Sequence, residues 1–173
     1  MITPDDKDWT WVLQRPCEEC GFDASTCSSA AVSDLVRLNA AQWNDLMTRG
    51  ALRAGRVDPD RWSSLEYACH VRDVFRRYDE RIVLMMTADD PLFPNWDQDA
   101  SAVDERYDSQ VPAVVADNLV AQASTVAERL DGLSEPEWMR KGRRSDGASF
   151  TIDTISRYMV HDPIHHLWDV EHG

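Results

Sequence analysis

Four long segments of this chain place apolar residues at intervals of three and four, and this spacing constrains the fold more than any other feature. Such spacing gives a helix one apolar face, which must be buried against other helices. The segments cover residues 31–49, 64–86, 111–130 and the stretch from after Ser149 to about 170. Their apolar faces comprise Val32, Leu35, Val36, Trp43, Leu46 and Met47, then Tyr67, Val71, Val74, Tyr78 and Ile82, then Val115, Leu119, Val126 and Leu130.

Local signals set the ends of these helices. Ser63 and Glu66 have the spacing of a capping box, in which each side chain satisfies a backbone donor at a helix start. "LSEPEW" predicts a short helical turn, with Ser134 as its cap and Pro136 in its first turn. Pro163 removes one backbone donor from the last helix and predicts a kink there. No segment alternates apolar and polar residues convincingly, so we expect no strands.

The connections between these helices predict how the helices are arranged. Residues 88–110 form a linker that is too long for a plain hairpin loop, which indicates a crossover between the second and third helices. We therefore predict an all-α fold, a four-helix bundle with one long crossover. A chain of 173 residues suits a single domain with a proper core. Residues 1–30 are expected to form an irregular segment with a CxxC motif, and residues 31–173 the bundle.

The charge of the chain narrows its partners. With 31 acidic and 18 basic residues, the formal net charge is −13. This charge argues against nucleic acid and against anionic membranes, which both attract clustered Lys and Arg. No segment approaches the roughly 20 apolar residues of a membrane span, and "MITPDDKDWTW" does not resemble a signal peptide. We expect a cytoplasmic protein that binds small molecules or proteins and that pairs as a homodimer through an exposed helix face.

Three of the five histidines lie within "HDPIHH" at residues 161–166. Residues four apart share one face of a helix, so His161 with His165, or Asp162 with His166, could bind one divalent ion. His70 is the only other histidine within the predicted bundle helices and falls at the edge of the buried face of its own helix. Three such ligands leave a coordination position open, as in catalytic sites. Alternatively, these histidines are core residues that only form hydrogen bonds.

The entry to the second helix, "WSSLEYACHVRD", and the "HDPIH" of the last helix resemble the DinB family. The resemblance covers residues 31–170 and extends to the related mycothiol-dependent maleylpyruvate isomerases. It implies a bundle that binds a divalent metal, here Zn or Ni, through one residue of the second helix and two of the fourth. His70 matches the helix-two ligand, with Glu66 and Asp73 as its supporting partners.

The resemblance implies two registers for the other two ligands. In the favoured, DinB-like register they are His161 and His165, because three imidazoles suit Zn²⁺ or Ni²⁺. In the alternative, isomerase-like register they are Asp162 and His166. Both pairs lie on apolar stripes of the helix, so periodicity does not separate them. The stripes contain Tyr158 and Trp168 for the first pair and Ile155 and Met159 for the second.

The resemblance also implies an activity. We expect a metal-dependent S-transferase, in which a small thiol loses its proton on meeting the metal and attacks an electrophilic substrate. The same ion could instead activate water, which would give a hydrolase. A third possibility from another class is a non-enzymatic bundle that binds a ligand or a partner.

The remaining motifs leave their alternatives open. "PCEECGFD" contains a CxxC at Cys17 and Cys20, which could be incidental thiols, a small metal knuckle, a disulfide or a redox pair. A second pair with zinc-ribbon spacing is absent from the sequence. Cys27 would add a third cysteine ligand, which leaves the set of four incomplete. Cys69 is expected to be a packing residue. The basic stretch at residues 140–150 predicts a solvated connection or an anion site.

Overall fold

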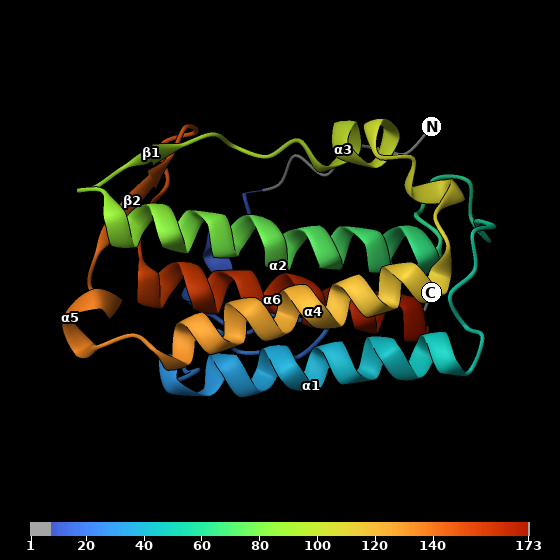
Figure 1. The fold of residues 1–173 in the computed structure, drawn as a ribbon, viewed down its shortest axis with the longest axis horizontal. Coiled ribbons are helices and arrows are strands. Elements are labelled where there is room, and N and C mark those ends of the chain that lie inside the picture. Colours follow the sequence, from blue (N-terminus) through green and yellow to red (C-terminus); the bar gives the residue numbers. More distant parts are fainter. Residues whose placement is uncertain (1–7, 173) are drawn as a thin grey trace.

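The computed structural model describes residues 8–172; residues 1–7 and 173 lie outside the described part. Four long helices form a bundle in which α4 and α6 each pack against both α1 and α2 (Figure 1). The predicted all-α bundle and its four helical segments are confirmed. The helices are α1 (Ser29–Thr48), α2 (Ser64–Thr87), α4 (Pro112–Asp131) and α6 (Ile152–His172).

The predicted helix signals are present. The Ser63 hydroxyl accepts a hydrogen bond from the Glu66 amide at 3.2 Å, and Glu66 accepts one from the Ser63 amide at 2.8 Å. This capping box starts α2. A second capping box, formed by Ser134 and Glu137, starts the short helix α5 (Glu135–Trp138). α6 continues through Pro163, whose carbonyl accepts a hydrogen bond from the Asn39 amide of α1 at 2.9 Å.

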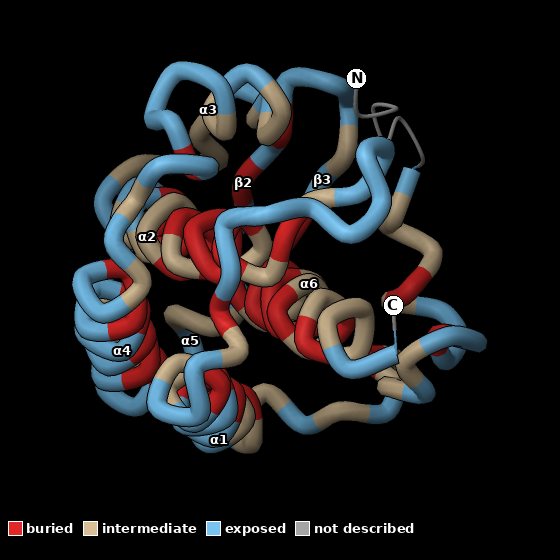
Figure 2. Tube along the Cα trace, turned by 90° about the vertical axis from the view of Figure 1, so that its right-hand side faces the viewer, coloured by how far each residue is buried: buried red, intermediate tan, exposed pale blue. Residues whose placement is uncertain are grey.

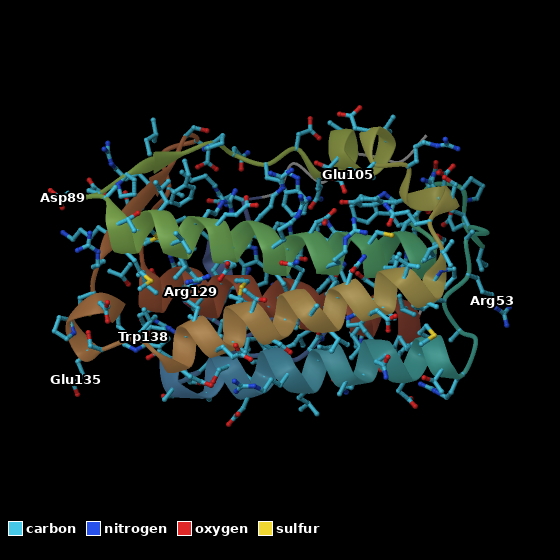
Figure 3. The ribbon with its side chains drawn as sticks, in the orientation of Figure 1. Arg53, Asp89, Glu105, Arg129, Glu135 and Trp138 are labelled. Carbon is cyan, nitrogen blue, oxygen red and sulfur yellow. The ribbon has the colours of Figure 1, made fainter. Side chains whose placement is uncertain are left out.

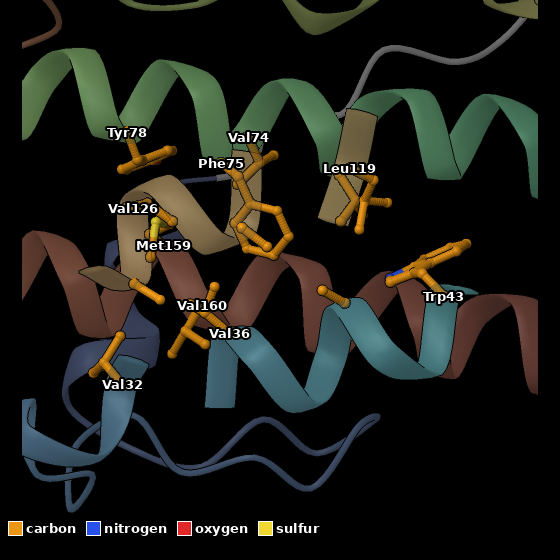
Figure 4. Close-up of a cluster of buried hydrophobic side chains, with 14 of the residues drawn as sticks. Val32, Val36, Trp43, Val74, Phe75, Tyr78, Leu119, Val126, Met159 and Val160 are labelled. Carbon is orange, nitrogen blue, oxygen red and sulfur yellow. The ribbon is translucent and has the colours of Figure 1, made fainter. Parts of the chain in front are cut away.

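The core lies along the inner faces of the four helices, where the buried residues gather in Figure 2. Phe75 of α2 and Leu119 of α4 both belong to this buried cluster (Figure 4). Val160 of α6 and Val36 of α1 belong to the same cluster. Charged residues such as Arg53 and Glu105 lie on the periphery (Figure 3). Burying these apolar stripes stabilises the bundle by roughly 25 cal/mol for each Å² removed from water.

The crossover between α2 and α4 runs along α2 (Figure 1). It is anchored by Tyr107, which is fully buried and donates a hydrogen bond to the Asp73 carboxylate of α2. Trp96 is fixed by a hydrogen bond from its indole nitrogen to the Ser101 hydroxyl at 2.7 Å. The crossover contains a short strand, β1 (Leu92–Phe93), a helix, α3 (Gln98–Asp104), and a 3₁₀ turn, η2 (Tyr107–Ser109).

A small three-stranded sheet closes one end of the bundle, and the expectation that strands are absent is wrong here. β1 pairs in parallel with β2 (Lys141–Arg144), which pairs antiparallel with β3 (Ser149–Thr151). The inward positions of β2 are Gly142 and Arg144, so its alternation of buried and exposed residues is not an alternation of hydrophobicity. The predicted connection at residues 140–150 is therefore a hairpin. Gly147, with φ of +101°, allows its turn.

Residues 8–28 pack on the bundle. A 3₁₀ turn, η1 (Trp9–Leu13), contacts α6, and the Arg157 guanidinium of α6 donates a hydrogen bond to the Ala24 carbonyl at 2.9 Å. The first seven residues of the expected irregular segment lie outside the described residues. They include most of "MITPDDKDWTW", the stretch that does not resemble a signal peptide. Within residues 8–172, no helix is long and apolar enough to cross a membrane.

Candidate metal centres

Metal-ligating side chains of α6 point in two directions. His161 and His165 lie on one face of the helix, and Asp162 and His166 lie one position further round. Each pair meets ligand-type side chains from a different part of the chain. Two clusters result, and we define them here as the His70 cluster (His70, Asp162 and His166) and the Cys17 cluster (Cys17, Cys20, His161 and His165). In each cluster, one donor atom per residue lies within 4.8 Å of all the others.

In the His70 cluster, two imidazole nitrogens converge on one carboxylate oxygen. The Oδ1 of Asp162 lies 2.8 Å from Nε2 of His166 and 3.4 Å from Nε2 of His70. His70 comes from α2 and is fully buried, whereas Asp162 and His166 are half-buried. Two nitrogens and one oxygen at this separation form a donor set that suits Zn²⁺ or Ni²⁺ and leaves room for further ligands.

Asp169 fixes the orientation of His166. Its Oδ2 lies 3.0 Å from Nδ1 of His166, so the other ring nitrogen faces Asp162. A carboxylate behind a histidine in this way is typical of metal-binding histidines, because it sets the tautomer and the ring orientation. Arg61 in turn lies 3.3 Å from Oδ1 of Asp169.

The charges in this cluster shift the pKa values of its members. Burial alone lowers the pKa of His166, but the carboxylates of Asp162 and Asp169 outweigh it and raise that pKa to about 9. Burial raises the pKa of Asp162, but His70 and His166 hold it well below its usual range. His70 has a lowered pKa because burial outweighs the attraction of Asp162. Asp162 is therefore a carboxylate at neutral pH and is paired with protonated His166, whose Nε2 proton a bound metal ion would displace.

Two tryptophans shield His70. The ring of Trp96 stacks on His70 with centroids 5.0 Å apart and an interplanar angle of 8°, and Trp62 lies 5.0 Å away at a tilt. Among the described residues, no group hydrogen-bonds to Nδ1 of His70. The aromatic walls exclude water from one side of the cluster and strengthen the electrostatic interactions inside it.

The Cys17 cluster joins the segment before α1 to α6. Sγ of Cys17 lies 3.5 Å from Nδ1 of His165, and Nε2 of His165 lies 3.1 Å from the Glu19 carboxylate. His161 is 4% exposed, and its Nε2 has no hydrogen-bond partner within residues 8–172. Burial lowers the pKa of His161 to about 4, and burial raises that of the Cys20 thiol to about 12.

Both clusters border one cavity of about 880 Å³. Its floor includes the four ligand-type residues of α6, and its walls combine aromatic rings with charged side chains, among which carboxylates outnumber arginines. Three arginines, Arg61, Arg81 and Arg144, add positive charge to the walls; Arg81 and Arg144 are 8% and 9% exposed. A cavity of this volume holds a drug-sized molecule, or two smaller ones side by side. The aromatic lining residues are Trp9, Trp62, Tyr67, Tyr78, Trp96 and Tyr158.

The structure places all five predicted ligand residues at this cavity or directly beneath it, but in a different grouping. His70 meets Asp162 and His166, the alternative register, whereas His161 and His165, the favoured register, meet Cys17 and Cys20. The proposed partners of His70 are engaged elsewhere. Glu66 binds Arg56 and the start of α2, and Asp73 binds Arg72, Arg76 and Tyr107.

Sequence reasoning missed Asp169, although its position three residues after His166 was a usable signal. It also missed the combination of the CxxC motif with His161 and His165. Cys17 and His165 are 148 positions apart in the sequence, so only folding brings the two motifs together.

Comparisons with known proteins agree with this architecture. A sequence model of the DinB superfamily matches residues 5–170. No curated protein matches the chain. Among solved structures, the chain is similar to YfiT from Bacillus subtilis, described as a probable metal-dependent hydrolase with an unusual four-helix bundle topology. The two share 16% sequence identity with a TM-score of 0.68, over 98% of this chain and 91% of YfiT.

Proposed function

Because this chain belongs to the DinB superfamily, we propose that it is a metal-dependent enzyme whose divalent ion is bound by His70, Asp162 and His166. The finer proposal is an S-transferase that joins a small thiol to an electrophilic substrate in the 880 Å³ cavity. The observation that carries the proposal is the convergence of two imidazole nitrogens on the Asp162 carboxylate at the floor of that cavity.

The residues of the His70 cluster fit a divalent ion. Oδ1 of Asp162 is negatively charged and faces the Nε2 atoms of both histidines, so a cation between them would satisfy all three donors. The set is one residue from α2 and two from α6, the arrangement that the resemblance to the DinB family implies. When bound, such an ion lowers the pKa of a thiol or water beside it and so supplies a nucleophile at neutral pH.

The chain itself supplies orientation and exclusion of water. Asp169 contacts Nδ1 of His166 and so directs Nε2 of the ring into the cluster. Trp96 covers the face of His70 and keeps its ring in place. These contacts hold the donors in position before any substrate arrives, so less reorganisation is needed during the reaction.

Arg81 supports a substrate with a negatively charged group. Its guanidinium is buried at the cavity wall, over the rings of Tyr78 and Phe93, and donates a hydrogen bond to the Pro94 carbonyl at 3.2 Å. Within residues 8–172, no carboxylate forms an ion pair with it. A buried cation is costly without a counter-charge, and a substrate carboxylate would supply one.

The S-transfer reaction balances without a redox partner. A bond forms between the thiol sulfur and an electrophilic carbon, while the bond from that carbon to its leaving group breaks. The thiol proton passes to solvent. No cysteine of the chain takes part, since the nucleophilic sulfur belongs to the substrate.

A hydrolase is the second candidate, because YfiT, which shares the fold, is described as a probable metal-dependent hydrolase. The same cluster would then act on water rather than on a thiol. The two activities differ in one requirement, since a hydrolase turns over without added thiol.

The test combines metal analysis with two assays. Protein purified without added metal should contain Zn or Ni, and His166→Gln should lose the ion of the His70 cluster and at least about 10²-fold of the activity. His172→Gln is the matched control, because His172 is exposed on the same helix and contacts the carbonyl and ring of Trp168 rather than a residue of either cluster. The substrates are chlorodinitrobenzene with glutathione, cysteine or mycothiol, and a nitrophenyl ester without thiol. Wild-type rates equal to those of His166→Gln in every assay would contradict the enzymatic proposal.

A further inference from the structure

We propose that Cys17, Cys20, His161 and His165 form a second metal site, a structural zinc site of the Cys₂His₂ type. This site is separate from the His70 cluster and requires no catalytic role for the protein. Two sulfurs from the segment before α1 and two nitrogens from α6 all lie within 4.8 Å of one another. The four residues are buried or half-buried.

The separations suit tetrahedral zinc. With Zn–S near 2.3 Å and Zn–N near 2.0 Å, the donor atoms of a tetrahedral site lie roughly 3.3–3.8 Å apart. Sγ of Cys17 and Nδ1 of His165 are already 3.5 Å apart, so these two donors need no movement. The remaining separations, below 4.8 Å, close with small side-chain rotations. Two thiolates neutralise the charge of Zn²⁺, which suits a buried position.

An unpartnered buried nitrogen gives an independent indication of a ligand. Nε2 of His161 is enclosed and forms no hydrogen bond with any residue from 8 to 172. A buried polar atom without a partner costs about 1–3 kcal/mol, so native structures rarely tolerate one without a reason. A cation beside His161 supplies the reason, since it would satisfy this nitrogen together with the two sulfurs.

The loop that carries the cysteines is shaped so that both sulfurs face α6. The Gly21 amide donates to the Cys17 carbonyl at 3.0 Å, and the Cys17 amide donates to the Phe22 carbonyl at 2.9 Å. Gly21 has a φ of +72°, a conformation that favours glycine.

His165 also has the supporting partner that a zinc ligand requires. Its Nε2 faces the Glu19 carboxylate at 3.1 Å, so Nδ1 is left free to face Cys17. Glu19 lies between the two cysteines in the chain, so the same short loop supplies two ligands and the group that orients a third.

Four protein ligands leave no open coordination position, so this site is structural rather than catalytic. It would tie the segment before α1 to α6 as a disulfide would, but without oxidation. That segment supplies Trp9 and Glu19 to the cavity wall, and the Trp9 ring contacts the rings of both His161 and His165. Zinc binding therefore fixes one wall of the cavity that borders the His70 cluster.

Cobalt substitution tests the site directly. Wild-type protein stripped of metal and loaded with Co²⁺ should show thiolate-to-cobalt charge transfer and the intense visible bands of tetrahedral cobalt. Cys20→Ser should lose most of this absorption and about one equivalent of zinc per chain. Cys27→Ser, in the same segment but outside the cluster, should keep both. His166→Gln should also keep the thiolate band, so a failure of the proposed catalytic site does not affect this result.

Thiol alkylation gives a second measurement that needs no variant. Cys17 and Cys20 of the zinc-loaded protein should react with iodoacetamide at least about tenfold more slowly than after chelation, because bound thiolates are shielded. Three outcomes would overturn the proposal. They are absence of the thiolate–cobalt band in folded wild-type protein, equal alkylation with and without zinc, and a Cys17–Cys20 disulfide in freshly purified protein.

Discussion

The carboxylate of Asp169 lies 3.0 Å from Nδ1 of His166 and 3.9 Å from Nε2 of His165, so one side chain lies behind a histidine of each cluster. The shorter contact is the stronger one. It fixes the orientation of the His166 ring and presents Nε2 to the Asp162 carboxylate. Asp169 thus acts through His166 rather than on any bound group itself, and we expect it to be a positioning residue.

Asp169→Asn should weaken metal binding at the His70 cluster by about 10–100-fold, because an amide holds the imidazole less firmly and makes it a poorer ligand. Competition with a chromophoric chelator measures the affinity. Asp153→Asn is the matched control, since Asp153 is also on α6 but pairs with Arg157, at 2.7 Å. Equal affinities for the wild type and Asp169→Asn would show that this contact does not support a ligand.

Removal of the metal from the Cys17 cluster should lower the melting temperature. In the His166→Gln background, which lacks the other site, saturation with zinc to about 100 Kd should add about 2.7 kcal/mol and raise Tm by roughly 5–10 °C over the chelated protein. Differential scanning calorimetry with and without chelator measures the shift. Adding Cys20→Ser to the same background should abolish this rise in Tm. If zinc still raises Tm in the double variant, the ion binds outside the Cys17 cluster.

Asp73 should make the free energy of unfolding depend on pH in the acid range. It is 1% exposed, and burial, which raises its pKa, is outweighed by Arg72, Tyr107 and Arg76, which lower it. Its pKa is therefore lower in the folded than in the unfolded chain. The stabilisation is complete above an unfolded pKa of about 4 and is lost as the pH falls from there through the folded pKa.

Asp73→Asn should accordingly destabilise the protein by about 2–4 kcal/mol at pH 7, because Arg72 loses its buried counter-charge, and by less below pH 4. Urea unfolding at several pH values measures this. Asp45→Asn, in an exposed pair with Arg49, should cost below about 0.5 kcal/mol at every pH. A cost for Asp73→Asn that does not change with pH would mean that packing, not charge, is lost.

The bundle could be predicted from the sequence because helical periodicity is a local signal. The grouping of the ligands could not, and His161 and Asp162 show why. They are neighbours in the chain, yet their side chains enter different clusters. Both stripes of α6 face inward, so the choice between them depends on which other segment packs against each face. The loop at Cys17 packs on one and α2 on the other, and neither pairing is encoded within α6.

The sheet escaped prediction for a related reason. A strand is recognised by alternation of hydrophobicity, but the inward residues of β2 are a glycine and an arginine. Arg144 is buried because it lies over Phe150 and Tyr158 and pairs with Asp146, at 2.7 Å. Gly142 is buried because two larger side chains cover it. In both cases burial depends on tertiary contacts, which the pattern of residues along the strand does not reveal.

Gly142→Ala should test how closely the sheet packs on α2. A Cβ at this position would lie 2.7 Å from Cγ of Met85 and 2.9 Å from Cε1 of Phe93, so both side chains would have to move. Such overpacking costs about 1–3 kcal/mol, which urea denaturation would detect. Gly55→Ala is the control, because a Cβ there meets nothing within 4 Å and should change stability by less than about 0.5 kcal/mol. Equal stability of the two variants would mean that Met85 moves aside freely and that β2 is not held closely against α2.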